Sequence, residues 1–205
     1  MKRLPLVATV IVGLAVATMI ALGVWQLDRR GQKEALIAQF AANQSRPSIA
    51  FPAIPMGDEL LFRRASAFCL EPVRETIAAG YNLKGERGWR HLVACRTGAE
   101  GPGFTVDIGW SVGFEVRSKW KGGAVDGVIG PMPDQRSVIE RSVADKAQQP
   151  LLLVATRGGG GLQPSAPPSL EGVPNNHLAY AVQWFLFAGI ALGIYGLALW
   201  RRQRK

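Results

Sequence analysis

The chain has 205 residues and a formal net charge of +9, with 24 basic and 15 acidic side chains. Apolar residues make up 48% of it, but they concentrate in one uncharged stretch near each end. Eighteen basic and all fifteen acidic residues lie between these stretches, which leaves the central segment at only +3. The remaining positive charge flanks the apolar stretches, so the high charge does not indicate nucleic-acid binding.

The first apolar stretch, residues 4–24, has no charged side chain. About 20 such residues suffice to cross the hydrocarbon core of a bilayer. In lipid the backbone must satisfy its own hydrogen bonds, so we expect a transmembrane helix. A cleaved secretory signal ending at Ala15-Val16-Ala17 is the alternative, but the apolar run exceeds the usual signal core and a basic segment follows it directly.

The second apolar stretch, residues 179–200, predicts another transmembrane helix. A basic tail, residues 201–205, follows it and contains three arginines and a lysine. Because positively charged flanks stay in the cytoplasm, the C-terminus is predicted inside. Two spans then place the N-terminus inside as well, and the central segment in the periplasm of a cell with an inner membrane.

Between the spans the sequence changes character twice. Residues 25–43 are rich in helix formers and predict a helical stalk that continues the first span. Residues 44–157 contain short strand-like segments separated by turn signals, with the clearest period-two alternation from Phe104 to Phe114. We therefore expect an antiparallel, β-rich small barrel or sandwich, and a helical turn near residues 137–147.

The segment 158–178 begins with four glycines and continues with several prolines. A phosphate-binding loop would need a Gly-Lys-Ser/Thr continuation and a following helix, and neither is present. We therefore predict a flexible linker that returns the chain to the membrane. The whole chain is predicted to be an integral membrane α+β protein, with two terminal transmembrane helices around an extracytoplasmic domain.

Few side chains point to catalysis. Cys69 and Cys95 lack the close spacing of a redox or zinc motif, and they could be buried free thiols, a disulfide or, least of all, metal ligands. His91 lies in a predicted strand, where a structural role is expected. No recognisable nucleophile motif accompanies either histidine, and we do not expect an enzyme.

The second histidine, His177, follows Pro174-Asn175-Asn176, which is a favourable helix start. It therefore falls in the first turn of the second span, at the outer surface of the bilayer. Tyr180 and Trp184 lie four residues apart on a face near it. These residues could simply anchor the helix at the interface, cover a partner helix, or offer an imidazole as an axial ligand to haem between the two helices.

The segment "PNNHLAYAVQWF" resembles the entrance to the last helix of the Surfeit locus protein one family, the cytochrome c oxidase assembly factors. The likeness rests on Asn175, Asn176, His177, Leu178, Tyr180, Ala181, Trp184 and Phe185. A second patch after the first span resembles the family pattern WQxxRxxxKxxLI through Trp25, Gln26, Arg29, Lys33, Leu36 and Ile37. The central strand keeps Gly109-Trp110 of the family's "VNRGWVP" but lacks its Asn-Arg pair and proline, and Arg64 is similar to the family's strand arginine.

The resemblance implies a non-enzymatic role in maturing a haem-copper oxidase. It implies that His177 is an axial ligand to haem a, with Tyr180 and Trp184 beside the bound group. The implied partners are haem a synthase, oxidase subunit I and the lipid bilayer. A scaffold that binds no cofactor and stabilises an oxidase assembly intermediate is the alternative. A periplasmic copper or thiol factor using Cys69 and Cys95 is a weaker one.

Overall fold

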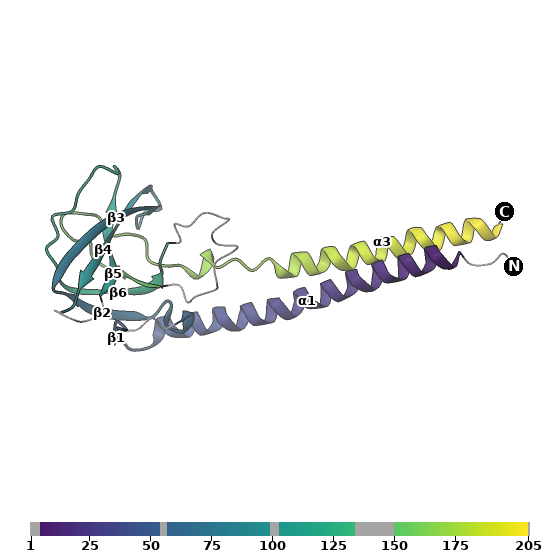
Figure 1. The fold of residues 1–205 in the computed structure, drawn as a ribbon, viewed down its shortest axis with the longest axis horizontal. Coiled ribbons are helices and arrows are strands. Elements are labelled where there is room, and N and C mark those ends of the chain that lie inside the picture. The colour runs from purple at the N-terminus through teal and green to yellow at the C-terminus, as the bar shows by residue number, and fades with distance from the viewer. Residues whose placement is uncertain (1–4, 54–56, 99–102, 134–149, 205) are drawn as a thin grey trace. The chain divides into compact units, whose positions relative to one another are not determined.

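The computed structural model describes residues 5–53, 57–98, 103–133 and 150–204 (Figure 1). Its contacts divide the chain into two compact units. The first combines Met1–Ile37 with Val173–Lys205, and the second is Ala38–Gly172. The helical turn predicted near residues 137–147 lies outside the described residues.

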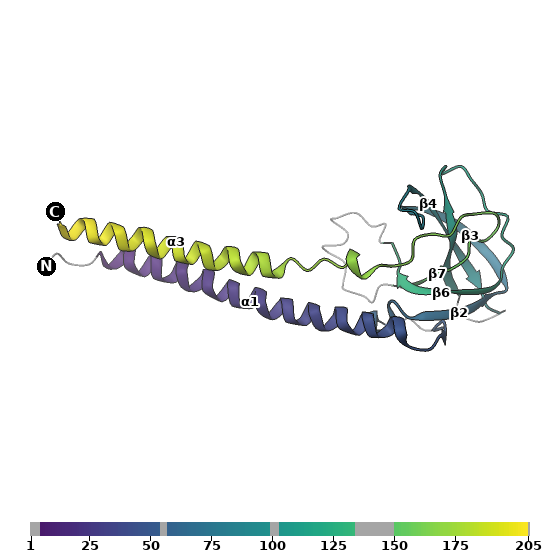
Figure 2. The same cartoon turned by 180° about the vertical axis from the view of Figure 1, so that it is seen from behind.

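The first unit is a pair of long helices, α1 (Leu6–Ser45) and α3 (His177–Arg204), which lie side by side (Figures 1 and 2). The most apolar window of α1 is only 11% buried and that of α3 only 6%, unlike the core helix of a soluble protein. By length and composition both helices could cross a membrane. α1 runs without interruption through the predicted span and the predicted stalk.

Small residues allow the two helices to approach closely. Val16 and Gly23 on α1, and Ala181 and Ala188 on α3, are buried and lie seven residues apart on their helices. A Cβ atom on Gly23 would come within 2.7 Å of the Phe185 ring. Spacing by seven residues keeps one seam of each helix against its neighbour, as in left-handed helix pairs.

The last turns of α1 belong to the second unit and are fixed to it by one amide. The Asn43 side chain is fully buried and donates to the carbonyl oxygens of Glu59 and Leu61, at 2.7 and 2.9 Å. These carbonyls belong to, or directly follow, the 3-10 turn η1 (Asp58–Leu60). Phe40 and Phe62 pack beside this contact with ring centroids 4.9 Å apart.

The second unit is built on a sheet with the strand order β1-β2-β6-β7-β5-β4-β3 in the part of the chain that the structure describes. Its strands are β1 (Ile49–Ala50), β2 (Arg64–Cys69), β3 (Glu71–Tyr81), β4 (Arg87–Arg96), β5 (Phe104–Ser111), β6 (Gly123–Pro131) and β7 (Leu151–Ala155).

The predicted α+β layout is confirmed, but the prediction of an antiparallel barrel or sandwich needs correction. β1 pairs with β2 in parallel, and β5 pairs with β7 in parallel, so the sheet is mixed. It is also open, with β1 and β3 at its edges. Parallel neighbours are joined by crossover connections, and the apolar pattern of single strands does not specify which strands become neighbours.

Two strands differ from their sequence patterns. β3 was not predicted, because it is an edge strand that contains a proline, a glycine and three charged residues instead of alternating apolar residues. In β5 the alternation suggested one buried face, but the residues of both faces are buried or nearly so. The strand also ends at Ser111, three residues before the predicted pattern does.

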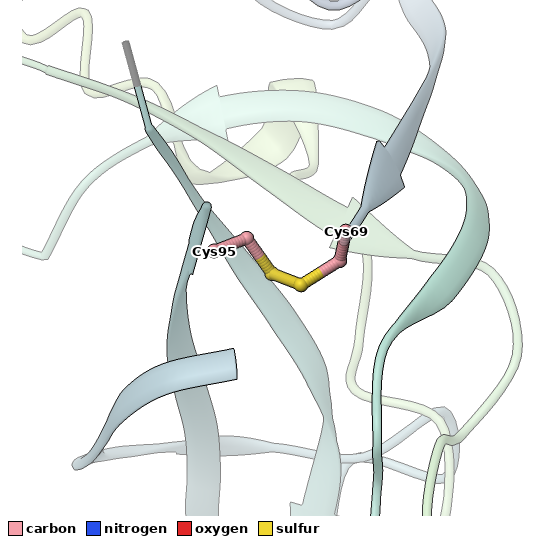
Figure 3. Close-up of a disulfide and its surroundings, with 2 residues drawn as sticks. All are labelled: Cys69 and Cys95. Atoms are coloured by element: carbon pink, nitrogen blue, oxygen red, sulfur yellow. A yellow bond between two sulfur atoms is a disulfide. The ribbon is translucent and has the colours of Figure 1, made fainter. Parts of the chain in front are cut away.

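A disulfide between Cys69 and Cys95 links two strands that are not neighbours in the open sheet (Figure 3). Cys69 ends β2 and Cys95 lies on β4, and four strand spacings separate these strands along the sheet. In a flat sheet that separation would be about 19 Å, at roughly 4.8 Å per strand. The Cα atoms are instead 5.2 Å apart, so the sheet bends until β2 and β4 meet. Of the alternatives for these cysteines, the structure contains the disulfide.

Part of the segment predicted as a flexible linker is a component of the second unit. Gly159 N donates to Ile108 O at 2.7 Å, and Trp110 and Gln163 exchange backbone hydrogen bonds of 2.7 and 3.1 Å. This strand-like contact explains the glycine before Trp110. Gly109 has φ +146°, and a Cβ there would lie 2.6 Å from Gln163 O.

The same segment covers a buried carboxylate on β5. Asp107 is fully buried and accepts hydrogen bonds from Arg90 Nε at 2.6 Å and from Ser165 Oγ at 2.8 Å. Burial raises the pKa of the Asp107 carboxyl above its ordinary value, while Arg90, Ser165 and the Gly109 N–H oppose that rise. Asp107 therefore joins β4, β5 and the segment after β7 through one polar site.

Replacing both cysteines by serine should destabilise the second unit, because the bond closes a span of 26 residues in the unfolded chain. The chain-entropy relation gives about 3–4 kcal/mol for a loop of that size. Thermal unfolding of the purified full chain, followed by tryptophan fluorescence, measures the loss. Dithiothreitol should lower the midpoint of the wild type and leave the double variant unchanged. Equal midpoints for the two proteins would contradict the structural role.

The stability contributed by Asp107 should depend on pH in a defined direction. Because its folded-state pKa is raised, the carboxyl favours the fold below the ordinary aspartate pKa, and this contribution is lost as pH rises through the folded-state value. Relative to Asp107→Asn, the wild type should therefore lose stability as pH rises from acid to neutral. Melting curves of both proteins over a pH series test this, and a constant difference between them would refute it.

Candidate functional site

The site proposed from sequence lies where α3 begins. His177 is the first residue of α3, and the Tyr180 N–H donates to Asn176 O at 3.3 Å in the first turn. Asn175 does not act through its side-chain oxygen, since that buried atom has no hydrogen-bond partner within the described residues. Capping by the Asn175 side chain, one form of the predicted helix start, is therefore not observed in the described part of the chain, and helix α3 starts two residues before the predicted span.

His177 contacts the other family-like patch. Its Nδ1 atom lies 2.8 Å from Oε1 of Gln26 on α1. The two residues are 151 positions apart, and each belongs to one of the two segments that resemble the family. Helix pairing thus joins the two segments that resemble the family through one hydrogen bond.

This contact defines what the imidazole can do. An amide oxygen only accepts hydrogen bonds, so Nδ1 carries the proton and donates to Gln26. In the neutral imidazole with this tautomer, Nε2 is the unprotonated nitrogen, with a lone pair for a metal or a donor. The side chain is half-buried. In metal sites, the ligating histidine usually donates a hydrogen bond from its other ring nitrogen, and this bond fixes the orientation of the ring.

The aromatic residues near His177 divide into two groups. Trp184 is half-buried, on the side of α3 that includes Ala181, and its ring lies edge-on to Phe187 at 6.2 Å. Tyr180 and Trp25 are about half exposed and lie on outward faces. Tyr180 is thus more exposed than His177 and Trp184. The shared role of the three side chains stays a prediction.

Of the other residues of the first patch, Arg29 belongs to a local network on α1. Arg29 donates to Gln32 Oε1 at 2.7 Å, and Gln32 donates to Asp28 Oδ2 at 2.8 Å. Arg30 and Glu34 form an exposed ion pair of 2.7 Å. These contacts are local pairs three or four residues apart, which modestly stabilise an exposed helix. Arg29 is not brought to His177.

Sequence reasoning missed a second cluster, inside the sheet. His91 is fully buried, with Nδ1 at 2.5 Å from Glu75 Oε1 and Nε2 at 2.8 Å from Ser111 Oγ. Its order of carboxylate, imidazole and hydroxyl is that of a hydrolase triad. These residues come from three strands and share no sequence motif, so only the strand register reveals the cluster.

The hydrogen bonds of this cluster argue against a nucleophilic serine. The Ser111 hydroxyl donates to Gly113 O at 2.8 Å, so the proton between Ser111 and His91 must come from Nε2. A nucleophilic serine needs the opposite direction, with the imidazole accepting. Glu75 also accepts from the backbone N–H and hydroxyl of Ser118, at 3.4 and 3.1 Å. The cluster therefore fixes the loop after β5 to β3 and β4.

Within the residues that the structure describes, no three His, Cys, Asp or Glu side chains gather in a group that could hold a metal ion. The glycines of the segment after β7 are used for packing: a Cβ on Gly158 would meet Leu162 O, and one on Gly160 would meet the backbone of Trp120. They do not form a phosphate cradle.

The described residues combine two terminal helices that could cross a membrane by length and composition, a β-rich unit, and a histidine that is hydrogen-bonded to Gln26. Comparison with models of known protein families gives a match to the SURF1 family over residues 13–189. The chain belongs to this family, which is associated with cytochrome c oxidase assembly and consists of assembly factors rather than catalysts. A search of curated proteins gave no match.

The His177–Gln26 contact should appear as an energetic coupling between the helices. In a double-mutant cycle of His177→Ala and Gln26→Ala, we expect about 0.6–1.7 kcal/mol, the range of interhelical hydrogen bonds in membrane proteins. Unfolding of the reconstituted full chain provides the four free energies. Gln183→Ala, on an exposed position of the same helix, is the matched control and should show no coupling to position 26. A coupling free energy of zero between His177 and Gln26 would exclude the contact.

Proposed function

We propose that this protein binds haem a and assists its insertion into subunit I of a haem-copper oxidase, with His177 as an axial ligand to the iron. Family membership supports the assembly role. The observation that supports the ligand is the Gln26 hydrogen bond, which holds the imidazole through Nδ1 and leaves Nε2 as the coordinating atom.

The surroundings of His177 suit a cargo that enters and leaves. The imidazole is half-buried rather than enclosed, and a single protein ligand holds iron less firmly than two. Trp184 would offer an apolar ring next to the macrocycle, and exposed Tyr180 an aromatic rim. Haem a is strongly apolar, so lateral transfer from haem a synthase to subunit I within the bilayer avoids exposure to water.

The proposed location follows from the charge distribution. Three arginines lie in the last turn of α3 and a lysine follows it, so both termini would lie in the cytoplasm and the β unit would lie in the periplasm, with the chain in the inner membrane. The disulfide supports this placement, because structural disulfides persist in oxidising compartments.

A scaffold without a cofactor is the second candidate. It is favoured by the long exposed apolar faces of α1 and α3, which could hold helices of an oxidase intermediate. In that case the His177–Gln26 bond would serve only to fix the helix pair.

Absorbance spectra of the full chain, purified from cells that make haem a, distinguish the two candidates. The wild type should carry haem, and His177→Ala should lose it. Gln26→Ala should bind about 10–100-fold more weakly, the usual effect of removing the group that orients a ligating histidine. Gln183→Ala should resemble the wild type. Unchanged haem content in His177→Ala rejects ligation by this residue, and a haem-free wild type that still supports oxidase assembly favours the scaffold.

A further inference from the structure

The second unit has an open sheet edge beside an apolar hollow and a basic surface, and none of these is part of the haem proposal. We propose that the outer edge of β3 binds an extended, acidic segment of a partner protein, which adds to the sheet as a further antiparallel or parallel strand. The argument rests on the direction of the backbone groups of β3, on the hollow at its end and on the charge around it.

The hydrogen-bond pattern of the β3–β4 hairpin fixes which backbone groups point outward. Asn82 N donates to Glu86 O at 3.2 Å, so Asn82 faces β4. Its neighbour Tyr81 must then face away, and Tyr81 O indeed accepts from Ala166 N at 2.8 Å. Because inward and outward residues alternate along an antiparallel strand, the N–H and C=O groups of every second residue from Tyr81 point to the free side.

These outward residues are Ala79, Ile77 and Glu75. Within residues 5–53, 57–98, 103–133 and 150–204, no backbone partner is recorded for their outward groups. The usable edge is limited at one end by Ala166 and the prolines that follow it. At the other end Pro72 and a register shift interrupt the strand. The free edge is therefore about five residues long, which is the common length of a strand.

An apolar hollow lies at the end of this edge. It has a volume of about 380 Å³, and its wall includes Ala79, Tyr81, Arg87, Trp89 and Val112. Ala79 pairs with Trp89 in the sheet, so both side chains lie on one face. A side chain of an added strand opposite Ala79 would point to the same face and reach the hollow. Backbone pairing would supply affinity, and this hollow would supply specificity for an apolar side chain.

The side chains around the hollow are apolar and exposed. Val112 is 74% and Phe114 59% exposed, and the Phe114 ring packs edge-on against Trp89 at 6.2 Å. The loop that carries them is held in place by the partly buried contact between Ser118 and Glu75. The exposed surface is thus fixed before any partner binds, which lowers the entropic cost of docking.

Charge identifies the chemistry of the partner. Residues 81–87 and 112–121 carry five basic and two acidic side chains, whereas the rest of the segment between the apolar stretches carries thirteen of each. All the excess charge of the central segment is therefore in these two segments, which contribute Tyr81, Arg87 and Val112 to the wall of the hollow. Of the two acids there, Glu86 already accepts from the Asn82 amide at 2.6 Å. A partner strand flanked by Asp or Glu would be complementary to this surface.

Peptide binding to the full chain in neutral-lipid nanodiscs tests the proposal. The probe is a labelled nonapeptide, Asp-Asp-Val-Thr-Phe-Thr-Val-Asp-Asp, and its partner replaces every Asp by Lys. Fluorescence anisotropy should show at least about tenfold tighter binding of the acidic peptide, or about 1.4 kcal/mol. Arg87→Ala should weaken it, and Arg157→Ala, an exposed arginine outside the surface, should not. No binding of the acidic peptide, or equal binding of both peptides, overturns the proposal.

A second pair of variants tests the edge itself. Ala79→Pro removes an outward N–H without removing a bond to β4, because proline is tolerated where the N–H faces away from the sheet. Ala79→Ser keeps the N–H and is the matched control. With both variants showing wild-type melting, only Ala79→Pro should lose peptide binding. Equal peptide affinity for the two variants overturns strand addition.

An anionic lipid surface is the competing occupant. Both native cysteines are in the disulfide, so Val112→Cys introduces a single free thiol for a fluorescent label. In proteoliposomes, quenching of that label by brominated lipid when phosphatidylglycerol is present would show docking on the membrane and overturn the peptide proposal. Absence of quenching, together with peptide binding, supports it. Haem content is not involved in either measurement, so a failure here leaves the haem proposal unaffected.

Discussion

Polar side chains that leave water need hydrogen-bond partners, and in this protein those partnerships connect elements that are distant in sequence. Asn43 ties the end of α1 to η1, Asp107 joins β4 and β5 to the segment after β7, and His91 joins three strands. In the helix pair, Gln26 is the hydrogen-bond partner of His177. An apolar replacement at any of these positions would leave a buried donor or acceptor without its partner.

The two histidines show how the same side chain acquires different roles. Both ring nitrogens of His91 are engaged by protein groups, one by Glu75 and one by Ser111, and the ring is fully buried. His177 has one nitrogen engaged and remains half exposed. A histidine with both nitrogens occupied is a structural connector, whereas one with a free and oriented nitrogen can bind a ligand. The difference supports assigning the cargo to the helix pair rather than to the sheet.

The organisation of the chain separates two kinds of contact. The helix unit presents apolar surface suited to lipid, haem and other helices, and the β unit presents an open strand edge with a positive rim. Under the proposals above, an assembly factor could recognise a protein through its sheet and handle a prosthetic group through its helices. The disulfide and the buried Glu75–His91 contact make the β unit a fixed surface for the first task.

The sequence by itself determined the features that depend on neighbouring residues. Uninterrupted apolar runs predicted the two terminal helices, period-two alternation located β5 in a β-rich central segment, and local motifs indicated the family and His177. Tertiary structure alone decided the contacts between distant residues. The pairing of Gln26 with His177, the Cys69–Cys95 bond and the Glu75–His91–Ser111 cluster each depend on helix packing or strand order. Neither β3 nor the structured part of the segment after β7 was predicted from the sequence. β3 is stabilised by pairing with β4, and the segment after β7 by its contact with Asp107. Neither kind of contact produces an apolar periodicity in the sequence.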